Sequence, residues 1–345
     1  MANIFDYVRA KEIAAYWEGL GSNKTPYLGA TLFPAKKQLG LDLSWLKGSK
    51  GLPVSLKPSA FDAKPPLRER IGFDQIVTEM PFFRESMYIG EKERQELNKV
   101  LASGNEKAID MIVRNIYDDA TGLIESADVV FERMRMQLLS GGTISITENG
   151  VPLSYDYGFD ATHKETLTTT SKWSDLDDSD PLGDIKSWQD TIEDDTGVRP
   201  TRAICTRKTF NYLLNNAALK TAASNANILP TEKNIKAIIE EELGVTIAIY
   251  NKKYNSSGAA TLFFPDDVFT LVPEGTLGYS YYGTTPEESD LMNSPGADVS
   301  IVNTGVALAT INHNQVPVNV ETVVSMIGLP SFESIDQVFI ATVHS

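Results

Sequence analysis

Cysteine and histidine are scarce in this sequence, which has one cysteine and three histidines among 345 residues. A single cysteine excludes an intramolecular disulfide, so we expect Cys205 to be a small core side chain in a protein made in a reducing compartment. His163, His313 and His344 stand far apart and form neither an H-x-x-x-H nor an H-E-x-x-H pair. Because metal and base sites need convergent partners, we assign these histidines structural or solvent-facing roles.

Motifs for phosphate and calcium binding are also missing. The sequence contains no G-x-x-x-x-G-K-[ST] and no G-x-G-x-x-G, so it gives no support to a phosphate-binding loop. An aspartate-rich run at 174–195 invites comparison with a calcium loop. In one register of that loop, Asp180 and Lys186 stand where the glycine and the bidentate glutamate belong. In another register, Leu182 and Gln189 occupy ligand positions that they do not suit, so neither register fits a calcium loop. We therefore expect no metal, no cofactor and no catalytic residues, and hence no enzyme.

Long hydrophobic runs are absent too. The first twenty residues lack the basic leader and unbroken apolar core of a signal peptide, and no stretch approaches the length of a membrane-spanning helix. We expect a chain that folds and acts without crossing a membrane. Its 345 residues, 42% of them hydrophobic, can fill a large core. That length predicts two lobes or one elongated domain.

Positive charge is in short supply overall but is concentrated in one place. The chain has 46 acidic and 31 basic residues and a net charge of −15, which argues against a broad basic face for nucleic acid. Residues 44–70, interrupted by proline and glycine, nevertheless hold six cations against two acids. We call these cations the basic stretch: Lys47, Lys50, Lys57, Lys64, Arg68 and Arg70. A mobile surface loop would explain them, but they would also suit an acidic surface on another copy.

The candidate for that acidic surface is the run at 174–195, where nine acids face one base, Lys186. We interpret it as a solvated or partner-facing surface. Its members, called here the acidic segment, are Asp175, Asp177, Asp178, Asp180, Asp184, Asp190, Glu193, Asp194 and Asp195.

The first half of the chain predicts an arm, a ribbon and a long helix. Apolar residues at helical spacing predict an amphipathic helix over 4–20. Strand-like pieces at 39–46 and 71–80 flank the basic stretch and predict a two-stranded excursion, which needs something else to lie on because such ribbons are marginal alone. An apolar stripe predicts a helix over 91–139, broken at 103–106. Its second part would be about 50 Å long.

The second half mixes strands and helices. Asn149-Gly150 between alternating runs predicts a hairpin. Helices are expected over 181–195, 207–216 and 231–243, with Gly244 ending the last. Strands are expected at "TRAIC", "VTIAIY", "ATLFF" and "VFTLV", and again through most of 299–343. The fold class is therefore α+β.

Three stretches carry a resemblance to a known family: "FPAKKQLGLDLSWLKGSKGLPVSLKPSAFDAKPPLRERIGF", "MPFFRESMYIGEKERQEL" and "LPSFESIDQVFIATV". With the order of elements, they make the chain resemble the lambda-like major capsid protein E family of tailed bacteriophages over nearly its whole length. The resemblance implies a Hong Kong 97-type fold. The arm would be 1–38, the extended loop 39–89, the peripheral domain with its spine helix 90–170, the axial domain 171–300, and the return to the peripheral sheet 301–345.

The resemblance also implies a function and partners. The chain would self-assemble, as pentamers and hexamers, into the icosahedral shell around the phage genome, without sequence-specific DNA binding and away from any membrane. Scaffolding, portal and decoration proteins are candidate partners, and assembly would occur in the bacterial cytoplasm before the protein is found in the virion. The alternatives are another multimeric phage protein, such as a tail-tube subunit, and an intracellular α/β enzyme.

Overall fold

A computed structural model describes residues 8–21, 26–47, 74–103, 106–148, 150–225, 227–256, 258–291, 297–313 and 318–344. The chain divides into two units, each with its own sheet. Unit 1 comprises Met1–Leu43, Val77–Glu132 and Tyr279–Ser331. Unit 2 comprises Ser44–Ile76, Arg133–Gly278 and Phe332–Ser345.

The sheet of unit 1 is built on one long central strand. Its twelve residues are buried over most of their length, as expected of an apolar run covered on both faces. This strand, β16, pairs antiparallel with β15 on one edge, and with β4 and then β13 on the other. β14 pairs with β15, and β1 runs parallel to β13. The bounds are β1 (Ala35–Lys37), β4 (Phe82–Ile89), β13 (Ser280–Tyr282), β14 (Ala297–Val302), β15 (Val306–His313) and β16 (Asn319–Pro330).

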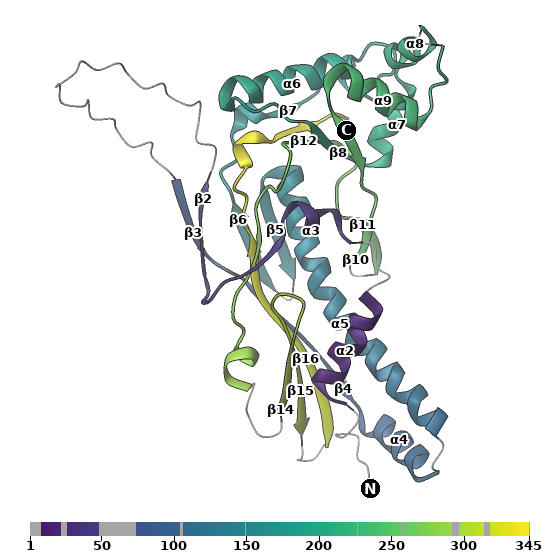
Figure 1. Ribbon diagram of the computed structural model, residues 1–345, viewed down its shortest axis with the longest axis vertical. Coiled ribbons are helices and arrows are strands. Elements are labelled where there is room, and N and C mark those ends of the chain that lie inside the picture. The colour runs from purple at the N-terminus through teal and green to yellow at the C-terminus, as the bar shows by residue number, and fades with distance from the viewer. Residues whose placement is uncertain are drawn as a thin grey trace, which may run out of the picture. The chain divides into compact units, whose positions relative to one another are not determined.

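Helices complete unit 1. The long helix predicted from the apolar stripe is confirmed as two helices, α4 (Glu91–Ser103) and α5 (Glu106–Gly141). All of α4 and residues 106–132 of α5 belong to this unit. α2 (Ala10–Gly21) lies beside α5 (Figure 1), where Tyr16 Oη donates to Asp118 Oδ1 at 2.7 Å. α2 also packs against β14 and β15. The short α3 (Leu28–Leu32) follows α2.

The sheet of unit 2 is mixed. Its order is β7 (Lys164–Thr166), β17 (Phe339–Thr342), β12 (Val268–Val272), β8 (Arg202–Cys205) and β9 (Thr246–Ile249). β12 is antiparallel to both neighbours, whereas the outer pairs are parallel. Four helices gather around it (Figure 1): α6 (Pro181–Thr196), α7 (Arg207–Asn215), α8 (Ala217–Asn225) and α9 (Glu232–Leu243). Trp173, Trp188 and Phe269 pack together in the core between helices and sheet.

Local sequence sets where these helices begin and end. Asp180 caps α6 by accepting from Gly183 N at 3.1 Å, with Pro181 in the first turn. Thr231 caps α9. Gly244 ends α9, as predicted, and its φ of 68° is a left-handed conformation that glycine adopts without strain.

Two hairpins and a ribbon contain the remaining strands of the described residues. The predicted hairpin is confirmed as β5 (Thr143–Glu148) and β6 (Val151–Asp156), with φ of 75° at Gly150. A second hairpin, β10 (Lys253–Ser256) with β11 (Ala259–Leu262), and helix α8 were not fully anticipated, since only a strand at 260–264 was predicted. β2 (Asp42–Lys47) and β3 (Asp74–Glu79) pair as the predicted ribbon. No helix within the described residues is long and apolar enough to span a bilayer.

Candidate functional site

The base of the ribbon is anchored through β2. Trp45 is buried and its ring lies 5.3 Å from that of Tyr157. Leu41 O accepts from Met80 N at 2.8 Å, which joins the two arms of the ribbon. The backbone of Lys47 lies in β2. The remaining predicted contact residues lie outside the described residues: Lys50, Lys57, Lys64, Arg68 and Arg70.

The N-terminal part of the acidic segment is tied to α6. Asp180 is the N-cap, and Asp175 Oδ1 accepts from the backbone N–H of Asp178 at 3.3 Å. Asp184 is half-buried and accepts from Trp173 Nε1 at 2.9 Å. Burial raises the pKa of Asp184 to about 6; the Trp173 hydrogen bond opposes this shift, and the negative charge of Glu165 adds to it. These aspartates therefore make their hydrogen bonds within unit 2.

The C-terminal part of the acidic segment is largely paired as well. Arg199 Nη1 donates to Asp190 Oδ1 at 2.6 Å and to Glu193 Oε2 at 2.5 Å, and these bonds raise the pKa of Arg199. Asp195 Oδ2 lies 2.9 Å from Nε2 of the buried His163. The interpretation of the whole segment as a solvated or partner-facing surface therefore needs correction for Asp184, which is half-buried against an indole.

Three members of the acidic segment remain exposed without a side-chain partner among the described residues. They are Asp177, Asp178 and Asp194. The part of this segment that is open to another molecule is thus smaller than its sequence suggests.

The other two histidines and the cysteine also have local roles. His313 Nε2 lies 2.9 Å from Glu321 Oε2 on neighbouring strands. His344 is buried beside Tyr212, and burial lowers its pKa. Cys205 is buried in β8, where desolvation raises its thiol pKa to about 12. Within the described residues, no group of three or more His, Cys, Asp or Glu side chains could hold a metal ion.

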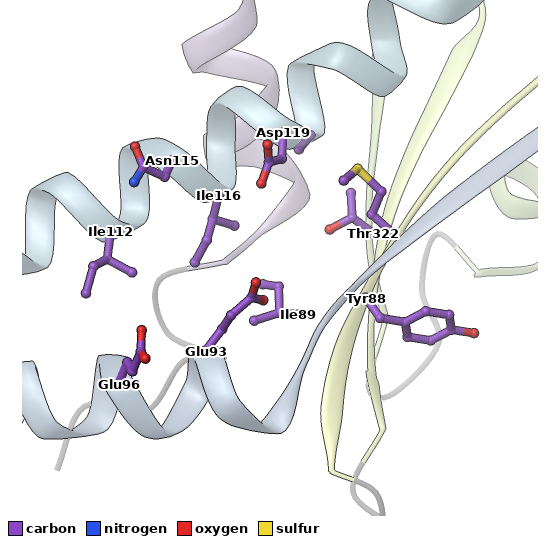
Figure 2. A pocket seen from close by; sticks show the side chains of 11 residues that line it. Tyr88, Ile89, Glu93, Glu96, Ile112, Asn115, Ile116, Asp119 and Thr322 are labelled. Carbon is purple, nitrogen blue, oxygen red and sulfur yellow. The ribbon is translucent and has the colours of Figure 1, made fainter. Parts of the chain in front are cut away.

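Sequence reasoning missed a hollow in unit 1, bounded by β4, α4, α5 and β16. It has a volume of about 270 Å³. Figure 2 shows its acidic side chains on the two helices and its apolar ones on α5 and β4. The lining residues are Met87, Tyr88, Ile89, Glu93, Glu96, Ile112, Asn115, Ile116, Asp119, Ala120 and Thr322.

The spacing of these residues was visible in the sequence, but their convergence was not. Ile112, Ile116 and Ala120 recur at four-residue steps, which places them on one face of α5. Glu93 and Glu96 likewise share a face of α4. Only the folded structure brings these faces to β4.

Two solved structures share this fold over almost their whole length. One is a phage-related protein from Bordetella bronchiseptica RB50, at 15% identity and a TM-score of 0.59, with 99% of this chain and 98% of that chain covered. The other, described as a prophage capsid protein from Escherichia coli CFT073, has 12% identity and a TM-score of 0.60, with 97% and 99% covered. At these identities the likeness is one of fold, and the fold is that of Hong Kong 97-type capsid proteins.

Comparison of the sequence with protein families shows the family to which the chain belongs. The family model described as phage major capsid protein E matches residues 9–343, so the chain belongs to the phage major capsid protein E family. Its function is to form a capsid shell. No curated protein sequence matches the chain at a significant level.

Proposed function

We propose that the chain builds the icosahedral head shell of a tailed bacteriophage from pentamers and hexamers. The observation that carries this proposal is the family match over residues 9–343, which leaves little of the chain for another role. We assign residues 1–38 to the arm, 39–89 to the extended loop, 90–170 and 301–345 to the peripheral domain, and 171–300 to the axial domain. The shell would hold DNA without reading its sequence, and a net charge of −15 suits a wall that does not grip phosphate.

Contacts between copies would involve the basic stretch. It interrupts an acidic chain, and Lys47 stands at the end of a ribbon strand. Each exposed ion pair would contribute about 0 to 1 kcal/mol. Many such weak contacts together would stabilise a closed shell, while a misplaced copy held by few of them could still dissociate.

The proposed function includes no catalytic step. Its support is the structural role of the family and the burial that keeps the Cys205 thiol protonated. Portal, scaffolding and decoration proteins are proposed partners, and the bacterial cytoplasm is the proposed place of assembly.

Negative-stain electron microscopy of the purified full chain, alone and co-expressed with the head proteins of its phage, tests the proposal. Icosahedral particles or curved sheets are expected. Tubes would instead indicate a tail protein, and discrete small oligomers under all conditions would contradict shell formation.

A further inference from the structure

The hollow in unit 1 combines an apolar floor with a rim of carboxylates. Ile89 and Ala120 are buried at its base, and Ile116 is half-buried beside them. Glu96 and Asp119 are exposed on the helices that border it. None of its eleven lining residues is basic. The hollow therefore offers apolar surface and negative charge, and its lining has no positively charged side chain to attract an anion.

The carboxylates of the rim come from both helices. Figure 2 shows Glu93 and Glu96 rising from α4 toward α5, and Asp119 extending from α5. Within the described part of the chain, Glu96 and Asp119 have no ion pair and no side-chain hydrogen bond. Glu93 Oε2 accepts from Gly90 N at 3.2 Å. The rim thus has acceptor oxygens that the described cations of the chain do not use.

A buried hydroxyl adds an acceptor where the sheet closes the hollow. Thr322 lies in β16, opposite Met87 of β4, and is 4% exposed. Figure 2 shows its hydroxyl on the side of the hollow that faces the helices. Among the described residues, no group forms a hydrogen bond with this hydroxyl. Because buried hydroxyls are normally hydrogen-bonded, this one points to a ligand that carries a donor.

The spacing of these acceptors distinguishes between kinds of cation. In the described ranges, no three His, Cys, Asp or Glu side chains converge closely enough to hold a metal ion. Glu93 and Glu96 are three residues apart on α4, a spacing that separates Cβ atoms by about 5–6 Å. An ammonium group has three donors and no acceptor, and an aliphatic chain packs on apolar surface while its charged end stays at a polar edge. Several ammonium groups joined by such chains therefore match spaced carboxylates over an apolar floor.

We propose that the hollow bounded by β4, α4, α5 and β16 binds a linear aliphatic polyamine. The methylene chain would lie over Ile89 and Ile116. The ammonium groups would pair with Glu96 and Asp119, and one of them would donate a hydrogen bond to Thr322 Oγ1. The volume of about 270 Å³ suits a small ligand, since pockets for drug-sized ligands occupy about 300–1,000 Å³. This inference goes beyond shell formation and does not rest on it.

Isothermal titration calorimetry of the purified full chain with spermidine tests this proposal. The hollow variant is Glu96→Gln with Asp119→Asn. The control is Asp177→Asn with Asp194→Asn, which removes the same charge at exposed sites of the acidic segment. Because two ion pairs to the ligand are lost, the hollow variant should bind spermidine about tenfold more weakly. The control should bind spermidine as the unmodified chain does.

Thr322→Val and Thr322→Ser form a second matched pair, in which only the serine keeps a hydroxyl. The valine variant should bind spermidine at least about threefold more weakly, because the amine loses an acceptor while the side chain keeps its shape. The serine variant should bind spermidine within about twofold of the unmodified chain. Melting temperatures of the ligand-free variants verify that each one is folded. Unchanged affinity of a folded valine variant would overturn the assignment of this hydroxyl to the ligand.

Two further titrations separate a polyamine from other cations. Mg²⁺ and Nα-acetyllysine amide should each bind at least about tenfold more weakly than spermidine, since neither has several ammonium groups on one chain. Mg²⁺ binding as tight as that of spermidine would indicate general attraction of counter-ions. Equal affinity for the lysine derivative would assign the hollow to a lysine side chain. Either result, or spermidine binding that is absent or unchanged in the hollow variant, would overturn the proposal and leave shell formation untouched.

Discussion

At the scale of single residues, Asp184 shows how burial changes the meaning of an acidic run. It belongs to a run with eight other acids, which was interpreted as solvated, yet its carboxylate accepts a hydrogen bond from the indole of Trp173. Nothing in the spacing of acids reveals that an indole eleven positions earlier turns toward one of them. Other members of the acidic segment, such as Asp177 and Asp194, are exposed.

Asp184→Asn should stabilise the protein above pH 6. The folded-state pKa of Asp184 is about 6, above its unfolded value, so its ionisation disfavours folding progressively as the pH rises from about 4 to 6. We expect a gain of about 1 kcal/mol at pH 8 and none at pH 4, since water access and the α6 N-terminus offset part of the penalty. Thermal unfolding at both pH values measures it.

Asp177→Asn is the control for that experiment, because Asp177 is exposed. It should change the melting temperature by the same small amount at both pH values. A stabilisation by Asp184→Asn that is equal at pH 4 and pH 8 would contradict the assigned pKa.

At the scale of elements, patterns within one segment were predictable and convergence between segments was not. The apolar stripe of α5, the break before Glu106 and the Gly150 turn follow from residues near in sequence. Helix α8 was missed because "NNAALKTAASN" gives a weak apolar period after α7. The hollow was missed because β4 and β16 are more than 200 residues apart, although Val320 pairs with Ile89.

Gly328→Ala should destabilise unit 1 strongly. A Cβ at Gly328 would lie 2.5 Å from Phe131 Cζ and 2.6 Å from Tyr281 O, so the central strand β16 could not keep its contacts with α5 and β13. We expect a loss of about 3 kcal/mol in the free energy of unfolding, measured by urea titration.

Gly122→Ala is the matched control, since a Cβ there meets no atom within 4 Å. Gly122 lies inside α5, where alanine favours the helix by up to about 1 kcal/mol. Equal stabilities of the two variants would show that the close packing around Gly328 is wrong.

At the scale of the whole molecule, the central feature is a basic stretch in a chain of net charge −15. If the cations act between copies through exposed pairs, salt should weaken assembly, since the Debye length falls to about 3 Å at 1 M. Light scattering of assembling protein should show a higher concentration threshold as salt rises. An unchanged or lower threshold would indicate assembly dominated by apolar contacts.

The most direct measurement of the central claim is electron microscopy of a chain carrying Lys57→Glu, Lys64→Glu, Arg68→Glu and Arg70→Glu. These reversals should leave the melting temperature of the unassembled protein unchanged and abolish particles, because four of the six cations of the basic stretch become acids. Normal shells formed by this variant at the usual protein concentration would contradict the account.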